Sequence, residues 1–438
     1  MGIFIFWMKK ILTAITISLP VVLLIFLVRM ESMANRELSP AECQVKKWNL
    51  PVDLATQQQK TPLPPALFQR ASVTCCQDDS SCLDNVIYQG ENGQIADKKA
   101  ILTAIDRSLR YLQTSNAVAA YQKYPVVGVT RDRVFKSLQR FRELLLTTNS
   151  PAELHAAIEK EFVFYQSIGK DGKGTVLFTA YYEPLYAASR TPTAEYRYPI
   201  YRLPPDLNSW TRPHPPRLAL EGADGLQGAK GKLRGLELFW FRDRLEPYLA
   251  QIQGSARLQL TDGTQTTVGY AGNIAYNYQS IGRELINDGK LPVEGVTMPM
   301  ILDYFHQYPQ ELNIYIPRDR SFVFFQENYG SPATGSISVP LTAERSIATD
   351  KSLMPPGALA LIRAAIPFAT TTNQLKHRTV SRYVLDQDAG GAIKGAGRVD
   401  YFLGTGKLAG DRAGVTVSNG QLFYPLLKPA SLRPNSQL

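Results

Sequence analysis

The sequence predicts a mainly β protein of the α+β class, with helices in an N-terminal prelude and strands after it. Apolar residues recur at helical spacing between about residues 100 and 160. β-branched and aromatic runs separated by glycine and proline turns dominate after Lys173. Hydrophobic residues make up 44% and charged residues 20% of the 438 residues, which favours a packed chain over a disordered one. At roughly 150 residues per domain, two or three domains are expected.

Residues 1–34 are predicted to be an export signal or a membrane anchor. Lys9 and Lys10 precede the uncharged stretch 11–28, close to the roughly 20 residues that span a bilayer. The positive-inside rule places the chain after this stretch outside the cytoplasm. Ser32-Met33-Ala34 offers a cleavage site, so a cleaved signal and a retained anchor both stay open. We expect an exported protein of the periplasm or cell envelope, held in the inner membrane by residues 11–28 if uncleaved.

Residues 35–95 are predicted to be a linker or weakly patterned segment. They contain the four cysteines, Cys43, Cys75, Cys76 and Cys82. In an oxidising compartment these could pair in three ways, and the sequence does not choose among them. Cys43 lacks a lipobox, which argues against a lipoprotein anchor. Because the cysteines lie far from the motif-rich region and there are only four His, neither a cysteine nucleophile nor a metal site is expected.

The prelude contains three predicted helices. The first carries six apolar residues on one face, Ala100, Ile101, Ala104, Ile105, Leu109 and Leu112. The second runs from about Arg131 to Leu146. The third begins at Ser150-Pro151-Ala152-Glu153, where a Ser cap, a Pro in the first turn and a Glu three residues on form a capping box.

The region after Lys173 is predicted to be rich in strands. Residues 174–182 and 321–325 have strand composition, and the Asp262-Gly263 turn between 256–260 and 265–268 indicates a hairpin. Residues 278–288 and 298–307 have helical patterns. Residues 185–235 are expected to hold short strands at best, and short strands with glycine turns are expected from residue 331 onward.

Residues 385–414 place three carboxylates between glycine-rich turns: Asp388, Asp400 and Asp411. Asp400 lies in an apolar run, where desolvation would raise its pKa and keep the carboxyl protonated, as a general acid requires. A solvated Asp400 on an outward strand position is equally open. Asp388 and Asp411 beside glycine are more typical of turns.

Two tyrosine clusters, in residues 178–184 and 269–279, combine aromatic faces with amide and hydroxyl groups. Such surfaces suit a sugar ring, although tyrosines also fill β-cores. Glu183 and Glu284 are candidate second carboxylates, Glu284 being more typical of a surface or capping charge.

Other chemistries find no support in the sequence. The chain has no phosphate-binding P-loop, no Gly-x-Ser-x-Gly elbow and no His-Glu-x-x-His motif. Residues 404–410 lack the spacing of a dinucleotide loop, so their glycines are interpreted as turns. The net charge of +10 favours an anionic partner, but without a Lys/Arg-dense helix a nucleic-acid binder is disfavoured.

Residues 385–414 resemble the three-aspartate domain of the lytic murein transglycosylase A family, and residues 175–356 are also similar to that family. The motifs that carry the resemblance are 178–184, 269–273, 278–283, 321–325, 339–341 and 350–357. The match covers most of residues 95–430. Ala180 stands where the family often has Gly, and several relatives are lipoproteins.

The resemblance implies a double-psi β-barrel interrupted by a smaller β-domain, with a glycan in the groove between them. The implied boundaries are 96–185 for the first part of the barrel with its helices, 186–330 for the insert, 331–430 for the second part and 431–438 for a tail.

The resemblance also implies the activity and the site. Asp400 would be the single catalytic acid and base in cleaving peptidoglycan to a 1,6-anhydromuramyl end, with Asp388 as a supporting carboxylate and no cofactor or metal. The implied partners are peptidoglycan glycan strands, the membrane if the anchor is retained, and cell-wall synthesis or division proteins. A non-catalytic peptidoglycan-binding protein is the alternative. The predicted glycan-binding residues are Thr179, Tyr181, Tyr182, Tyr270, Gly272, Asn273, Tyr278, Gly391 and Lys394.

Overall fold

The computed structural model describes residues 68–71, 83–90 and 95–429. The predicted anchor and all four cysteines lie outside these ranges, so the anchor and the disulfide pairing stay predictions. Across the described ranges, no helix is both long enough and apolar enough to cross a membrane.

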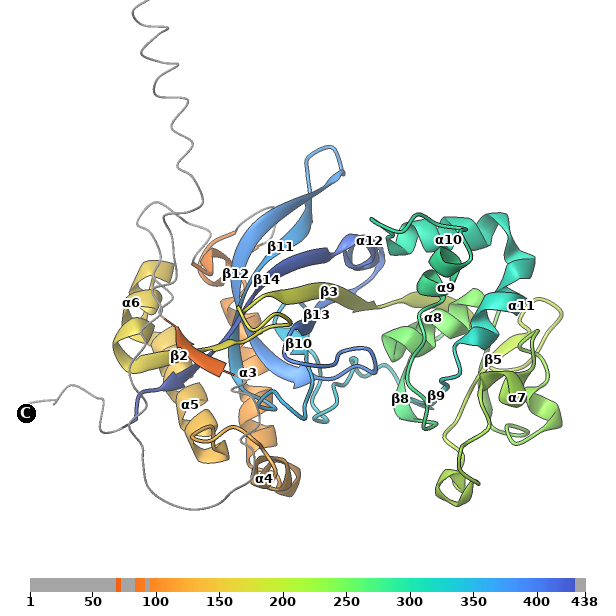
Figure 1. The fold of residues 1–438 in the computed structure, drawn as a ribbon, viewed down its shortest axis with the longest axis horizontal. Coiled ribbons are helices and arrows are strands. Elements are labelled where there is room, and N and C mark those ends of the chain that lie inside the picture. Colours follow the sequence, from red (N-terminus) through yellow and green to blue (C-terminus); the bar gives the residue numbers. More distant parts are fainter. Residues whose placement is uncertain (1–67, 72–82, 91–94, 430–438) are drawn as a thin grey trace, which may run out of the picture. The chain divides into compact units, whose positions relative to one another are not determined.

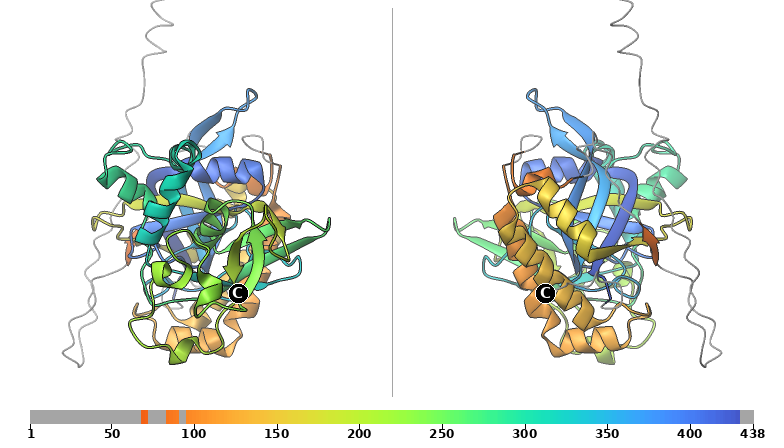
Figure 2. Two further views of the ribbon diagram at one scale, coloured as in Figure 1. Left: turned by 90° about the vertical axis from the view of Figure 1, so that its right-hand side faces the viewer. Right: turned by 90° about the vertical axis from the view of Figure 1, so that its left-hand side faces the viewer.

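Within the described residues, the prelude contains four helices. They are α3 (Lys98–Leu112), α4 (Ser115–Gln122), α5 (Arg131–Thr147) and α6 (Pro151–Glu161). The apolar face predicted for α3 is largely buried. At the start of α6, the Ser150 side chain accepts from the Glu153 amide, and the Glu153 carboxylate accepts from the amide of Asn149 at 2.8 Å. The predicted cap is therefore present, with the return bond shifted by one residue from the usual capping box. The orange and yellow helices pass in front of the blue strands in the right-hand view of Figure 2.

Six strands close into a barrel (Figure 1). β14 pairs with both β11 and β3, which joins the two ends of the strand order β14-β11-β12-β10-β13-β3. The pairs β10–β12 and β13–β3 are parallel. The barrel strands are β3 (Val176–Glu183), β10 (Ser346–Ala348), β11 (Leu359–Ala369), β12 (Leu375–Asp388), β13 (Arg398–Thr405) and β14 (Val417–Leu427), and β2 (Phe162–Ser167) and β1 (Phe68–Ala71) extend the sheet from β14.

A second six-stranded sheet is built from chain that leaves the barrel after β3 and returns at β10. Its strands are β4 (Leu185–Ser189), β5 (Tyr198–Tyr201), β6 (Glu237–Phe241), β7 (Ser255–Leu260), β8 (Gln265–Asn273) and β9 (Val323–Glu327). Its helices are α7 (Arg217–Glu221), α8 (Leu245–Gln253), α9 (Ile281–Asn287), α10 (Met298–Gln307) and α11 (Leu312–Tyr315). The predicted hairpin is the antiparallel pair β7–β8. The predicted fold class, mainly β with an inserted β-domain and a helical prelude, is confirmed.

Two expectations for the C-terminal third are wrong. β11, β12 and β14 span 11, 14 and 11 residues, so the strands there are long rather than short. Residues 404–410 do not form turns alone, because α12 (Lys407–Val415) begins after Gly406 and includes Gly410. Asp411 is therefore a helix residue rather than a turn former, and its carboxylate pairs with Lys407 at 2.7 Å.

A buried arginine fastens the prelude to the barrel. Arg345, just before β10, is fully buried and pairs with Asp84 at 2.5 Å and with Asp97 at 2.6 Å. Asp84 also accepts from the backbone amide of Tyr383 in β12 at 2.8 Å. The start of the prelude is thus held against the strand that ends at Asp388.

Candidate active site

Asp400 and Asp388 are brought to the same level of the barrel by strand register. Asp400 on β13 and Asp388 at the end of β12 both pair with Ala348 of β10, one from each side. On β13, Val399 and Tyr401 are buried in the main core, whereas Asp400 is only partly buried. The alternation of a strand therefore gives Asp400 a different face from its apolar neighbours.

Thr179 holds the Asp400 carboxyl. It lies opposite Asp400 in the parallel pair β3–β13, and its Oγ1 donates to Asp400 Oδ1 at 2.7 Å. Burial raises the pKa of Asp400 to about 6, although the Thr179 hydrogen bond and the charge of Arg398 lower it. The negative charge of Asp388 raises it further. Asp400 can therefore hold a proton near neutral pH and still ionise readily.

Asp388 is engaged by three hydrogen-bond donors. The Tyr181 hydroxyl donates to Oδ2 at 2.7 Å, and the amides of Ser336 and Ala389 donate to Oδ1, each at 2.8 Å. Burial raises the pKa of Asp388, and these three bonds act in the opposite direction. The bonds fix the orientation of the Asp388 carboxylate, which suits a supporting residue better than a mobile acid.

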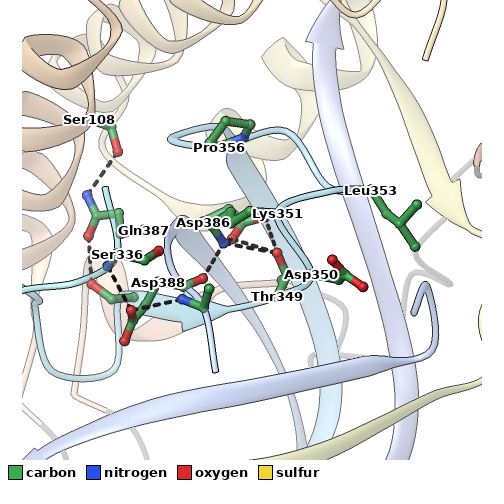
Figure 3. A network of polar contacts seen from close by, with 12 residues as sticks. Ser108, Ser336, Thr349, Asp350, Lys351, Leu353, Pro356, Asp386, Gln387 and Asp388 are labelled. Atoms are coloured by element: carbon green, nitrogen blue, oxygen red, sulfur yellow. Dashed lines mark hydrogen bonds and ion pairs between the residues drawn. The ribbon is translucent and has the colours of Figure 1, made fainter. Parts of the chain in front are cut away.

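A network of polar contacts adjoins Asp388 (Figure 3). Lys351 Nζ donates to the carboxylate of Asp386, to the backbone carbonyl of Asp388 and to Thr349 Oγ1. Asp386 is fully buried and also accepts from the Tyr424 hydroxyl at 2.7 Å. The strand end that carries Asp388 is thus tied to the barrel interior.

Gln387 ties the same strand end to the helical prelude. Its Nε2 donates to the Ala104 carbonyl and to Ser108 Oγ of α3, both at 2.9 Å, and its Oε1 accepts from Ser346 Oγ at 2.7 Å. Three successive residues of β12 thus have different surroundings: Asp386 contacts the barrel interior, Gln387 contacts the prelude, and Asp388 lies in the candidate site.

Two of the predicted glycan-binding residues contact the carboxylates directly: Thr179 contacts Asp400 and Tyr181 contacts Asp388. Tyr278 of the insert lies against the loop after Asp388, since a Cβ at Gly391 would be 4.0 Å from the Tyr278 Cβ. Lys394 is exposed in that same loop.

The remaining predicted glycan-binding residues make other contacts. The Tyr182 ring packs against the main core, and its amide donates to Gln253 of α8 at 3.2 Å. On β8, the hydroxyl of the half-exposed Tyr270 donates to Asn273. A Cβ at Gly272 would come within 2.6 Å of Leu203, so glycine there permits close packing.

The other two candidate carboxylates, Glu183 and Glu284, each form an ion pair with an arginine. Glu183, at the end of β3, is buried and pairs with Arg257 of β7 at 2.7 Å, which fastens the exit of the chain into the insert. Glu284 of α9 pairs with Arg318 at 3.2 Å, in keeping with a surface charge.

The sequence did not single out Ser336, Lys351 or Arg398. Ser336 acts through its backbone amide, and its contact with Asp388 joins residues 52 positions apart. Lys351 lies inside the motif 350–357, but only the fold reveals its contact with Asp388. Arg398 could have been found from strand alternation, because it lies two residues before Asp400.

Two sequence families match the chain. The MltA specific insert domain matches residues 177–326 and the 3D domain matches residues 345–426. The membrane-bound lytic murein transglycosylase A of Escherichia coli is 32% identical over 252 residues, which are 57% of this chain and 65% of that protein. The aligned region thus spans less than two thirds of that relative's length. The Vibrio cholerae protein of the same name is 29% identical over 315 residues, 70% of this chain and 81% of that protein.

Solved structures are similar in fold. The membrane-bound lytic murein transglycosylase from Agrobacterium tumefaciens matches with a TM-score of 0.61 and 26% identity, over 79% of this chain and 95% of that chain. Escherichia coli MltA with bound chitohexaose matches with a TM-score of 0.58 and 26% identity, over 75% of this chain and 90% of that chain.

Proposed function

This chain belongs to the lytic murein transglycosylase A family, and from that premise we propose that it is an enzyme that cleaves peptidoglycan glycan strands. The bond cleaved is the β-1,4 bond between N-acetylmuramic acid and N-acetylglucosamine, and the product ends in a 1,6-anhydromuramyl residue. The observation that carries the proposal is the Asp400 carboxyl, held by Thr179 with a pKa raised to about 6 by burial.

In the first step, protonated Asp400 donates its proton to the glycosidic oxygen, and the bond from that oxygen to the muramyl C1 breaks. Proton donation by a positioned carboxyl contributes on the order of 10² to 10⁴ in rate. The Thr179 hydrogen bond then stabilises the carboxylate that remains.

In the second step, the muramyl C6 hydroxyl attacks C1 and the Asp400 carboxylate takes the proton of that hydroxyl. The attacking group belongs to the substrate itself, so proximity supplies much of the rate. No water is consumed, and the acid is restored. One carboxyl that gains and loses a proton easily is therefore enough, whereas a hydrolase would need a second one.

Asp388 is proposed as the supporting carboxylate. Its three donors, Tyr181, Ser336 and Ala389, leave it little freedom to take a proton from substrate, but they fix its charge two strands from Asp400. That charge helps keep the Asp400 pKa high.

The proposed setting is the cell envelope, with glycan strands as the partner. The Escherichia coli relative is named membrane-bound, and Escherichia coli MltA was solved with bound chitohexaose. Whether residues 11–28 anchor this chain can be tested by fractionating cells and measuring the mass of the mature N-terminus.

The deciding experiment incubates full-length protein with purified sacculi and identifies the released ends by mass spectrometry. Ends with 1,6-anhydromuramic acid are expected. Reducing ends would instead indicate a hydrolase. Binding without products would favour the alternative, a non-catalytic peptidoglycan-binding protein.

A further inference from the structure

Arg398 is a half-buried cation close to Asp400 that forms no hydrogen bond or close ion pair within the described residues. It begins β13, lies two residues before Asp400 and therefore shares its strand face. Its Nη1 is fully buried without a hydrogen-bond acceptor. A buried donor without an acceptor is destabilising, and such donors are rare in folded proteins.

The polar side chains around the aspartates of the candidate site already have partners. Thr179 is bonded to Asp400, Tyr181 to Asp388, and Lys351 to Asp386. The carboxylate of Asp388 also accepts hydrogen bonds from the amides of Ser336 and Ala389. Arg398 thus differs from these groups in having a buried N–H donor, Nη1, that no described group accepts.

We propose that Arg398 is a specificity-determining residue that binds the lactyl group of the muramyl sugar whose bond Asp400 cleaves. This inference rests on the proposed function. N-acetylmuramic acid differs from N-acetylglucosamine by a lactyl ether on O3, which ends in a carboxylate when free and in an amide carbonyl when a stem peptide is attached. A guanidinium donates to either acceptor and binds a carboxylate through two parallel hydrogen bonds.

Adjacency to Asp400 gives this contact a selective value. A muramyl lactyl oxygen seated on Arg398 would fix the sugar next to the acid, whereas a chitin oligosaccharide leaves the guanidinium unpaired. Sites built to hydrogen-bond one substrate group reject the analogue that lacks it, because their polar groups then stay unsatisfied.

The test measures glycan binding with the Asp400→Asn protein, so that no turnover occurs. Peptide-free glycan strands prepared from sacculi are compared with chitohexaose and with glycan strands whose lactyl carboxylates have been reduced to alcohols. Arg398→Gln is expected to weaken binding of the peptide-free strands at least about tenfold. Arg398→Gln should change chitohexaose binding less than about twofold. Arg398→Lys keeps the charge but loses the paired N–H donors of the guanidinium, so its affinity for peptide-free strands should lie between that of the protein with Arg398 intact and that of the Arg398→Gln protein.

The matched control is Arg234→Gln, which removes an exposed arginine of the insert and should leave all three affinities unchanged. Thermal unfolding of each variant checks folding. Equal weakening for muramyl glycans and chitohexaose, or no weakening for either, would overturn the inference.

A second measurement separates lactyl binding from a purely electrostatic action on Asp400. With Asp400 intact, Arg398→Gln is expected to raise KM for glycan strands more than it lowers kcat. An unchanged KM with only a displaced pH profile would overturn the inference in favour of charge tuning. Wild-type product analysis reports separately on the proposed function, since selective muramyl binding without anhydromuramyl products would reject that function and leave the binding contact standing.

Discussion

Asp388 and Asp400 lie on either side of Ala348, each paired with this one residue of β10. At about 4.8 Å between neighbouring strands, their Cα atoms are about 10 Å apart. Burial is the main cause of the raised pKa of Asp400, and the Asp388 charge adds to it. The two carboxyls are thus coupled electrostatically while their hydrogen-bond partners stay separate.

Asp400→Asn should abolish cleavage and preserve the fold. Asn keeps the size of the side chain but cannot donate the carboxyl proton, so we expect kcat to fall by at least about 10³-fold. Release of soluble muropeptides from sacculi measures turnover, and sedimentation with sacculi measures binding. Substantial residual activity would show that another group is the acid.

The activity should decline as pH rises above about 6. Asp400 must be protonated to start the reaction, and its pKa is raised to about 6, so kcat/KM should fall up to tenfold per unit on the alkaline side. Thr179→Val removes a bond that lowers this pKa and should move the alkaline limb upward. An alkaline limb that stays in place in this variant would contradict the assignment of the limb to Asp400.

Asp400→Asn should also stabilise the protein at alkaline pH. The pKa of Asp400 is higher in the folded chain than in the unfolded one, so ionisation favours unfolding once pH exceeds the unfolded value near 4. The substitution removes this penalty, and we expect a gain of about 1 to 3 kcal/mol at pH 8 that disappears below pH 4. Urea unfolding at both pH values measures it, and an equal effect at each would point to packing instead.

Tyr181→Phe should impair turnover with little effect on the fold. It removes the donor to Asp388 Oδ2, and a buried acceptor left unpaired costs about 1 to 3 kcal/mol. We expect kcat/KM to fall roughly 10-fold to 100-fold. Tyr186→Phe is the matched control, because Tyr186 packs against the apolar core of the insert sheet, and a loss of similar size in both variants would contradict a specific effect of the Tyr181–Asp388 bond.

Lys351→Met should destabilise the barrel. It leaves the fully buried Asp386 without its cation, a change that costs about 3 to 5 kcal/mol. Lys407→Met breaks the exposed pair with Asp411 and should cost less than about 1 kcal/mol. Chemical unfolding compares the two, and similar losses would mean that Lys351 does not stabilise the strand end.

Local features were predictable from the sequence, and contacts between distant segments were not. The Ser150 cap and the Asp262-Gly263 hairpin depend on residues within a few positions of each other. The long strand β11 is buried along nearly its whole length, so it lacks the alternation that marks a half-exposed strand.

Helix α12 escaped prediction because its glycines disfavour a helix by about 1 kcal/mol each. The fold requires them for packing. A Cβ at Gly410 would lie 2.8 Å from the Tyr182 ring, and one at Gly414 would lie 3.2 Å from Pro299 of α10. Asp400 was predicted from its sequence motif, but the hydrogen bond to its carboxyl comes from Thr179, 221 residues away in the chain.

That separation has a consequence for biogenesis. The two barrel neighbours of β3 are β13 and β14, and both follow the entire insert in the chain. During synthesis β3 therefore cannot pair within the barrel until these strands have been made. Contacts of such high sequence separation make folding slow, because the loop-closure entropy is lost before the contacts form. We expect the insert to fold first and bring β3 near the C-terminal strands, so a chain truncated before β13 would expose unpaired strand edges that favour aggregation.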